Sequence, residues 1–243
     1  MIPAGQAMPQ LEVENWSFWS PEGSDPSLWL KHWQNAGVAA GVGSPPVDQV
    51  PAMQRRRMSR LSKMALSTAL QVLGENTVDY SIFCSQHGEI ARTRDILNSI
   101  SSSSEISPAA FAQSVHNTSS GLFTIITASN APSMSMASGA NTFAYAWLEA
   151  QAYALIHPAH RILLVDFDEA LPEVYRQYSA DKVCDHSMAL LLRATEHGGI
   201  TLSRSDDAEN QHLPQGPQFL AWLQSNAGDL SLASDGQGWR WAR

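Results

Sequence analysis

The stretch from Ala131 to Asn141 has the residue types of a buried strand that turns sharply into the start of a long apolar helix. Enzymes commonly mount a catalytic nucleophile at such a strand-to-helix turn. This turn contains Met134 and Met136 but no cysteine. A methionine thioether has no proton to lose, so it cannot be acylated as a thiolate can. The stretch therefore has the shape of a catalytic site without an evident nucleophile.

Ser138 offers an alternative nucleophile, with His116 or His87 as its base. This pairing would make the chain an autonomous acyl hydrolase or acyltransferase. A serine at a helix start, however, usually turns its oxygen toward backbone N–H groups, and no G-x-S-x-G elbow is present. We therefore expect Ser138 to cap a helix that continues to about Ile156.

Carboxylates follow two predicted strands and could do acid–base or metal chemistry. Glu89 lies close to His87 after one strand, and Asp166, Asp168 and Glu169 end another. Turns and helix caps use the same residue types, and we favour that structural role. The histidines have no metal-ligand spacing, and no phosphate-binding loop or dinucleotide fingerprint follows a strand. The sequence predicts no metal and no cofactor.

A basic run opens the predicted helix over residues 53–73 and comprises Arg55, Arg56, Arg57 and Arg60. It could contact the acidic surface of a carrier protein, which leaves a carrier-protein scaffold as an alternative function, although a solvated helix face is the commoner meaning of such a run. The whole chain carries a formal net charge of −8, which argues against a nucleic-acid partner.

Strand-like and helix-like segments alternate along most of the chain, which favours a layered α/β fold with a mostly parallel sheet. We expect one domain over residues 1–243, with residues 1–10 as a loose leader and residues 37–50 as a loop. The run 122–127 fits either a strand or a helix. Strands are expected at 11–19, 78–85, 161–167, 186–193 and 199–203, and helices at 26–33, 53–73, 90–101, 108–120, 138–156 and 219–223, the last one amphipathic.

The apolar segments and the cysteines indicate in which cellular compartment the protein functions. No N-terminal stretch combines basic residues with an apolar run, and no apolar run approaches the roughly 20 residues that a membrane span requires. Cys84 and Cys184 match no zinc or redox spacing and are expected to be buried free thiols. We expect a cytoplasmic protein with no membrane span.

A series of short motifs lies along the chain in the order Ile106-Ser107-Pro108, Val115-His116-Asn117, Gly121, Pro132-Ser133 and Ser138-Gly139, followed by an alanine-rich helix and a strand. This series resembles the N-terminal half of a β-ketoacyl synthase, an enzyme of the thiolase fold that joins acyl units held on an acyl carrier protein. The resemblance covers roughly residues 50 to 205, and nothing after Ser205 adds to it.

The departures from this family matter as much as the match. The resemblance implies a nucleophilic cysteine three residues before Gly139, where this chain has Met136. The histidines, or histidine and asparagine, that polarise the thioester belong to the C-terminal half of the family, which is not matched. Without nucleophile and oxyanion donors, little catalytic stabilisation would remain.

The combination resembles the short, cysteine-free chain length factors of aryl-polyene pathways. Such a subunit would form a heterodimer or larger complex with a full-length ketosynthase, and through it meet the acyl carrier protein of a type II fatty-acid or polyketide-like pathway. The strand ending at Met136 would pair with its counterpart across the dimer axis, and half of a thiolase fold would leave a large apolar face for the partner. Residues implied at the tunnel or interface are Ala110, Phe111, Ser114, Val115, His116, Asn117, Met134, Met136 and Phe143.

Overall fold

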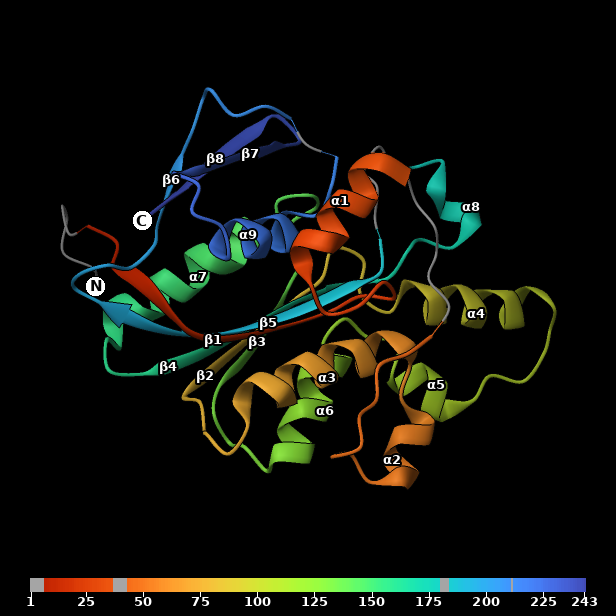
Figure 1. Cartoon of the computed structure of the whole chain (residues 1–243). Helices are drawn as coiled ribbons and strands as arrows, with labels where there is room; N and C mark the ends of the chain where they lie inside the picture. Colours follow the sequence, from red (N-terminus) through yellow and green to blue (C-terminus); the bar gives the residue numbers. More distant parts are fainter. Residues whose placement is uncertain (1–6, 37–42, 180–183, 211) are drawn as a thin grey trace.

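The computed structural model describes residues 7–36, 43–179, 184–210 and 212–243. A five-stranded sheet divides the molecule, with helices on both faces and a second, smaller sheet above one helical layer (Figure 1). The order of the large sheet is β1-β5-β4-β2-β3. Its strands are β1 (Gln10–Trp19), β2 (Tyr80–Cys84), β3 (Ser133–Met136), β4 (Arg161–Asp168) and β5 (His186–Thr195). The predicted α/β class is confirmed.

The direction of strand pairing is mixed rather than mostly parallel. β2 pairs in parallel with β3 and β4, whereas β5 runs antiparallel to both β1 and β4. Parallel neighbours require a long crossover, usually a helix. The connection between β4 and β5 carries α8 (Glu173–Arg176), which has only four residues. The apolar run of β4, buried on both faces, gave no information about the direction of its neighbour.

The helices below the sheet are α2 (Ala52–Arg57), α3 (Arg60–Leu73) and α6 (Thr118–Thr127). The expected single helix over 53–73 is wrong, because the chain breaks at Met58 and Ser59. Ser59 has extended backbone angles, and its Oγ accepts a hydrogen bond from the Ser62 backbone N–H at 2.9 Å. Serine at this position satisfies a free N–H of a new helix, so α3 starts afresh.

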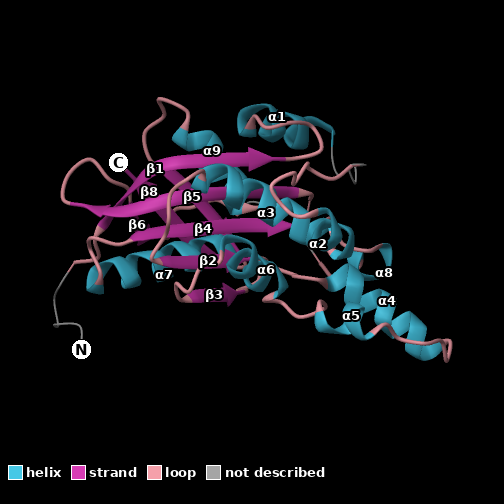
Figure 2. Ribbon diagram, turned by 90° about the horizontal axis from the view of Figure 1, so that it is seen from below, coloured by secondary structure: helices cyan, strands magenta, loops and turns pink. Residues whose placement is uncertain are grey.

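A second expected helix is also divided. α5 (Pro108–Ala112) has five residues, with Ser107 as its cap, and α6 begins only at Thr118. Gly121 therefore lies inside α6 rather than at a helix end, and the ambiguous run 122–127 is helical. Together with α4 (Ile90–Ser101), α5 forms an arm over residues 90–112 that extends away from the sheet (Figure 2).

Three helices cover the opposite face of the sheet: α1 (Pro26–Ala36), α7 (Thr142–Ile156) and α9 (Gln215–Leu223). The small sheet lies above α7 in the order β6-β8-β7, with β6 at Thr201–Arg204, β7 at Leu230–Ser234 and β8 at Gln237–Ala242. The helix expected at 219–223 is part of α9, but its expected amphipathic character is wrong, because α9 is buried along Gln215–Trp222.

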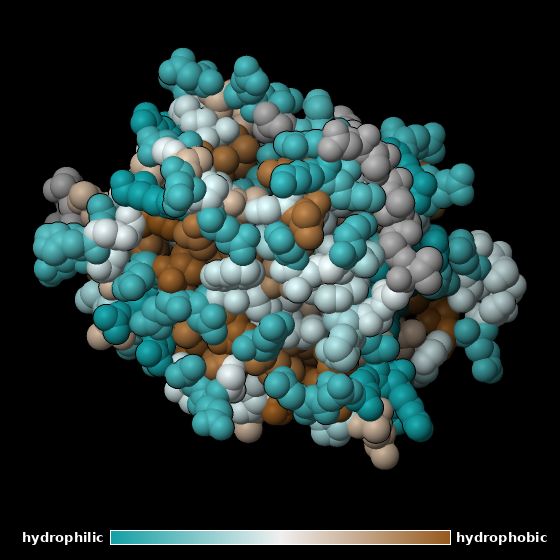
Figure 3. Space-filling view, viewed as in Figure 1, coloured by the Kyte–Doolittle hydropathy of each residue, from teal (hydrophilic) through white to brown (hydrophobic). Residues whose placement is uncertain are grey.

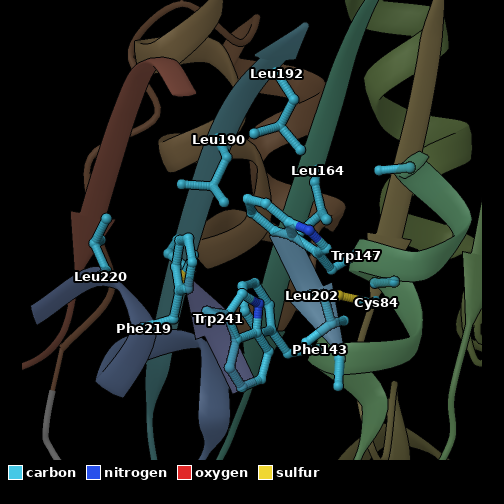
Figure 4. Close-up of a cluster of buried hydrophobic side chains, with 14 of the residues drawn as sticks. Cys84, Phe143, Trp147, Leu164, Leu190, Leu192, Leu202, Phe219, Leu220 and Trp241 are labelled. Carbon is cyan, nitrogen blue, oxygen red and sulfur yellow. The ribbon is translucent and has the colours of Figure 1, made fainter. Parts of the chain in front are cut away.

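Aromatic side chains join α7 to these C-terminal elements (Figure 4). The ring centroid of Trp147 lies 4.9 Å from that of Phe219, and Phe143 lies 5.2 Å from Phe219 and 6.0 Å from Trp241. These rings lie in one buried cluster that also holds the upper face of β4 and β5. The chain's own C-terminal segment therefore covers α7, and the exposed apolar side chains lie elsewhere, among them Phe111 and Met134. On the face seen in Figure 3, hydrophobic residues lie in separate areas divided by hydrophilic ones.

The N-terminal segment is bonded to the rest of the protein from Pro9 onward. The carbonyl of Pro9 accepts a hydrogen bond from Gln151 Nε2 at 2.8 Å, and Gln10 begins β1. Residues 1–6 of the expected leader and residues 37–42 of the expected loop lie outside the described residues. None of the helices in the described chain is long and apolar enough to span a membrane.

Truncating Trp241 to alanine should lower the free energy of unfolding by about 3–5 kcal/mol, because it removes a fully buried ring between α7 and α9. Urea denaturation measures this loss. Tyr178→Ala is the control, since that ring is 79% exposed and its loss should change stability by less than about 0.5 kcal/mol. Equal effects for both variants would contradict the packing role of the C-terminal segment.

Candidate functional site

β3 forms an edge of the large sheet (Figure 2). It pairs only with β2 among the described strands, and the side chains of Ser133 and Met134 are exposed. The expectation of a buried strand is thus wrong, because burial here depends on strand order rather than on residue type. The outer backbone N–H and C=O groups of β3 are open to another strand.

Met136 ends β3 beside Cys84, its register partner in β2. Its half-buried side chain packs against the buried cluster of α7 and the C-terminal elements. Ser138 does not cap α7, which starts at Thr142. Instead, the Ser138 backbone N–H donates to Thr142 Oγ1 at 2.8 Å, and that hydroxyl donates to the Gly139 carbonyl at 2.6 Å. Gly139 has a φ of 56°, which lets the loop turn without Cβ strain.

Asn141 fixes this loop to the C-terminal elements. Its Oδ1 accepts hydrogen bonds from Trp239 Nε1 at 2.8 Å and Gln215 Nε2 at 3.3 Å, and its Nδ2 donates to the Ser234 carbonyl at 3.0 Å. The carboxylate of Asp235, in the β7–β8 turn, lies 3.4 Å from the place that a Cβ on Gly139 would take. One side of the loop between Met136 and Thr142 is therefore filled by the chain itself.

The two candidate bases for Ser138 lie near the end of β2. His116 Nε2 donates to the Ser85 carbonyl at 2.9 Å, and its ring lies against Gly88, where a Cβ would be 2.7 Å from the ring. His87 Nε2 is buried without a partner among the described residues. None of the hydrogen bonds found in the described chain joins Ser138 to either histidine, so this geometry assembles no serine–histidine pair.

The acidic residues at the end of β4 face a buried histidine rather than solvent. His186 Nε2 lies 3.4 Å from Asp166 Oδ2, and its Nδ1 donates to the Cys184 carbonyl at 2.9 Å. Both ring nitrogens thus face acceptors, which suits an imidazolium. Burial lowers the pKa of His186, but the hydrogen bond and charge of Asp166 outweigh it and hold the pKa well above the usual 6.5.

Asp168 completes this buried group. It accepts hydrogen bonds from Ser85 Oγ at 2.7 Å and from the Gln86 and His87 backbone N–H groups, while burial raises its pKa.

Burial also raises the pKa of the Cys84 thiol well above its usual value, so this cysteine is not a ready nucleophile. Within the described ranges, no cluster of three or more His, Cys, Asp or Glu residues could hold a metal ion.

The arginines of the basic run differ in their surroundings. Arg55 Nη1 pairs with Asp48 at 2.8 Å. Arg60 is bonded to Glu169 at 3.1 Å and to Asp185 at 3.0 Å, so it ties α3 to the loop after β4. Arg56 and Arg57 are exposed. Only part of the predicted carrier-contact run therefore faces solvent.

The residues expected at the tunnel or interface fall into three environments. Phe111 and Val115 are 64% and 49% exposed, and Asn117 is exposed, whereas Ala110, Ser114 and His116 are half-buried. Met134 lies at the β3 edge. Phe143 is 2% exposed and belongs to the core, so it is not on this surface.

Sequence reasoning missed apolar residues on the same arm. Leu97, Ile100 and Ile106 are 51%, 56% and 39% exposed. The signal was present, because Ile96, Leu97 and Ile100 recur at helical spacing, but that pattern usually marks a buried face. Here the arm carries its apolar side chains to the surface.

Comparison with known families identifies the fold. A family model described as the N-terminal domain of β-ketoacyl synthase matches residues 29–242, and the chain belongs to this family. The fold is therefore thiolase-like, as the sequence motifs predict. The match extends beyond the expected range of 50 to 205 at both ends, because the C-terminal elements are also recognised. No curated protein matches the chain.

Solved structures give the same result. The chain is similar, at 29% identity and a TM-score of 0.83, to a chain of the ketosynthase ApeO in complex with its chain length factor ApeC from Xenorhabdus doucetiae. The match covers 96% of this chain and 99% of that one.

Two more distant structures show the fold alone. The ishigamide ketosynthase/chain length factor matches with 14% identity and a TM-score of 0.64, over 82% of this chain and 68% of that chain. The AntDE:AntF complex of a type II PKS acyl-carrier protein with its ketosynthase matches with 11% identity and a TM-score of 0.57, over 83% and 70%.

Replacing His186 with glutamine should destabilise the protein most at low pH. The folded pKa of His186 is raised, so its ion pair with Asp166 contributes fully below the unfolded pKa of 6.5 and is lost as the pH rises through the folded value. The loss should be about 3 kcal/mol at pH 6 and smaller at pH 10, as measured by urea denaturation.

The exposed His197 supplies the control for this experiment. His197→Gln should leave the free energy of unfolding within about 0.5 kcal/mol at both pH values. A His186→Gln loss that does not change between the two pH values would show that the imidazolium contributes no ion pair.

Proposed function

We propose that this chain is a non-catalytic ketosynthase-like subunit, a chain length factor, that pairs with an active β-ketoacyl synthase and shapes its acyl tunnel. The single observation that carries this proposal is Met136 at the end of β3, where the resemblance places the nucleophilic cysteine. A thioether there forms no thioester. The two cysteines of the chain, Cys84 and Cys184, are buried and have raised pKa values, so neither replaces it.

The proposed partner is a full-length ketosynthase that retains its cysteine. The near-complete match to a chain of the ApeO–ApeC complex supports this pairing. The exposed edge of β3 also supports it, because an open strand can extend the sheet of a second chain of the same fold. We place the complex in a type II fatty-acid or polyketide-like pathway of the aryl-polyene kind.

The proposed tunnel wall is the segment from Ala110 to Asn117. Phe111 on the arm and Val115 in the turn that follows it are exposed, although such large apolar side chains are usually buried. A growing polyene is long, flat and apolar, so a wall of this composition suits it, and the bulk of one side chain decides where the product stops. Met134 and Met136 would contribute from the β3 side.

The carrier protein would reach this chain through the complex. Arg56 and Arg57 are the exposed arginines of the basic run and are our proposed contacts for its acidic surface. No observation favours the alternative of an autonomous hydrolase based on Ser138, since its candidate bases are bonded elsewhere or unpaired with it.

The isolated chain should not be acylated by an acyl thioester, because it offers no accessible thiolate at the β3–α7 turn. Intact-protein mass spectrometry after incubation with the thioester measures this directly. Met136→Cys should still lack condensing activity, since a thiol alone supplies no oxyanion donor. Turnover by the wild-type chain alone would overturn the proposal.

Enlarging Val115 to phenylalanine should shorten the product made by the complex, because the added ring would narrow the tunnel. Val174→Phe is the matched control, as Val174 is 54% exposed and lies on α8, away from the arm. Chromatography of the products from each copurified complex gives the length distribution. An unchanged distribution with Val115→Phe in an intact complex would remove Val115 from the tunnel wall.

A further inference from the structure

The arm of α4 and α5 is held to the molecule with little hydrophobic packing. In these two helices, which lie wholly within the described chain, no residue is buried. A pocket of about 660 Å³ separates the arm from the start of α3, with Ile96, Ile106 and Ala110 on the arm side and Arg57, Ser59 and Arg60 on the other. An element with so few buried apolar contacts needs other interactions to fix its position.

Arg92, on the first turns of α4, supplies such interactions. Its Nη1 donates to Gln113 Oε1, just past α5, at 2.9 Å, and its Nη2 donates to the Arg57 carbonyl at the end of α2 at 3.4 Å. Its Nε lies 3.8 Å from Glu89 Oε2. One guanidinium thus joins α2, α4 and the end of α5, which its planar fork of donors allows.

Glu89 anchors this guanidinium to the body of the protein. Its side chain is buried, and Oε1 accepts hydrogen bonds from Ser59 Oγ at 2.6 Å and Ser62 Oγ at 2.8 Å, both at the start of α3. Ser62 Oγ lies 3.2 Å from Ser119 Oγ of α6. Burial raises the pKa of Glu89 above its usual value, and the two serine hydrogen bonds and the Arg92 charge offset only part of that rise. The Glu89 carboxylate therefore connects Arg92 of α4 to Ser59 and Ser62 at the start of α3.

We propose that Glu89 and Arg92 form a clasp that positions the arm, and thereby fixes the shape of the tunnel wall at Ala110 to Asn117. This inference rests on the proposed function for its effect on product length. Both are positioning residues, since they act through the arm and not on the acyl chain. A loosened arm would present Phe111 and Val115 in several positions and would give products of mixed length.

Arg92→Gln tests the clasp, with Arg94→Gln as the matched control. Arg94 is on the same helix but bonds only its neighbour Asp95 among the partners found in the described chain. Hydrogen exchange on the full chain should show amides of residues 102–113 exchanging about ten-fold faster or more in Arg92→Gln, because bonds to a charged group are lost. Amides of β4 should not change, and Arg94→Gln should match the wild type.

The second measurement is product length in the copurified complex with the ketosynthase. Arg92→Gln should broaden the distribution at normal complex yield, and Arg92→Lys should restore it only in part, because an ammonium keeps the charge but not the fork. If the amides of residues 102–113 exchange hydrogen at the wild-type rate in Arg92→Gln, the proposed clasp is wrong. Faster arm exchange with an unchanged product distribution would overturn its role in the tunnel.

The two measurements separate this inference from the proposed function. Hydrogen exchange is measured on the chain alone, so it tests whether Glu89 and Arg92 position the arm even if no ketosynthase binds the wild-type protein. Failure of the wild type to bind any ketosynthase would instead refute the proposed function and leave the exchange result standing.

Discussion

The burial of α7 between the two sheets is the interaction on which the rest of this structure depends. Phe143 and Trp147 of α7 contact Phe219 of α9, and Trp241 of β8 closes the same cluster. Because α7 is apolar on most of its surface, it is stable only when covered on both sides. The C-terminal segment provides the second cover and, through Asn141, fixes the loop that leads into α7. The described chain thus covers α7 with its own C-terminal elements.

This arrangement has a chemical meaning under the proposed function. The loop after β3 joins a strand to a helix, Met136 stands where the resemblance places the nucleophilic cysteine, and the Asp235 carboxylate lies close to Gly139. What the molecule offers outward is an open strand edge and an arm with exposed apolar side chains. Both features suit a role in shaping a neighbour's site.

The sequence predicted what depends on local pattern. The uninterrupted apolar core of residues 162–165 indicated β4, and the spacing of apolar residues indicated α3, α4 and α7. What it missed depends on distant contacts. The restart at Ser59 is supported by Glu89, 30 residues away, and the role of Arg92 involves Gln113 and Arg57, 21 and 35 residues away. The exposure of β3 follows from sheet order, and the cover over α7 follows from aromatic residues whose partners no periodicity identifies. The order of the motifs singles out Met136 for the proposed function, because that comparison needs only a local stretch of sequence.

The open edge of β3 has a consequence for how the protein must be produced. An unpaired strand is a template for any other strand, and Ser133–Met136 is short, with two small polar side chains that limit its attraction. Two copies of this chain present the same edge to each other, so a cell that makes it in excess over its partner would face self-association. Synthesis of this chain in equal amounts with its proposed ketosynthase partner would keep the β3 edge covered. The ratio of the two subunits would then determine how much of the chain self-associates.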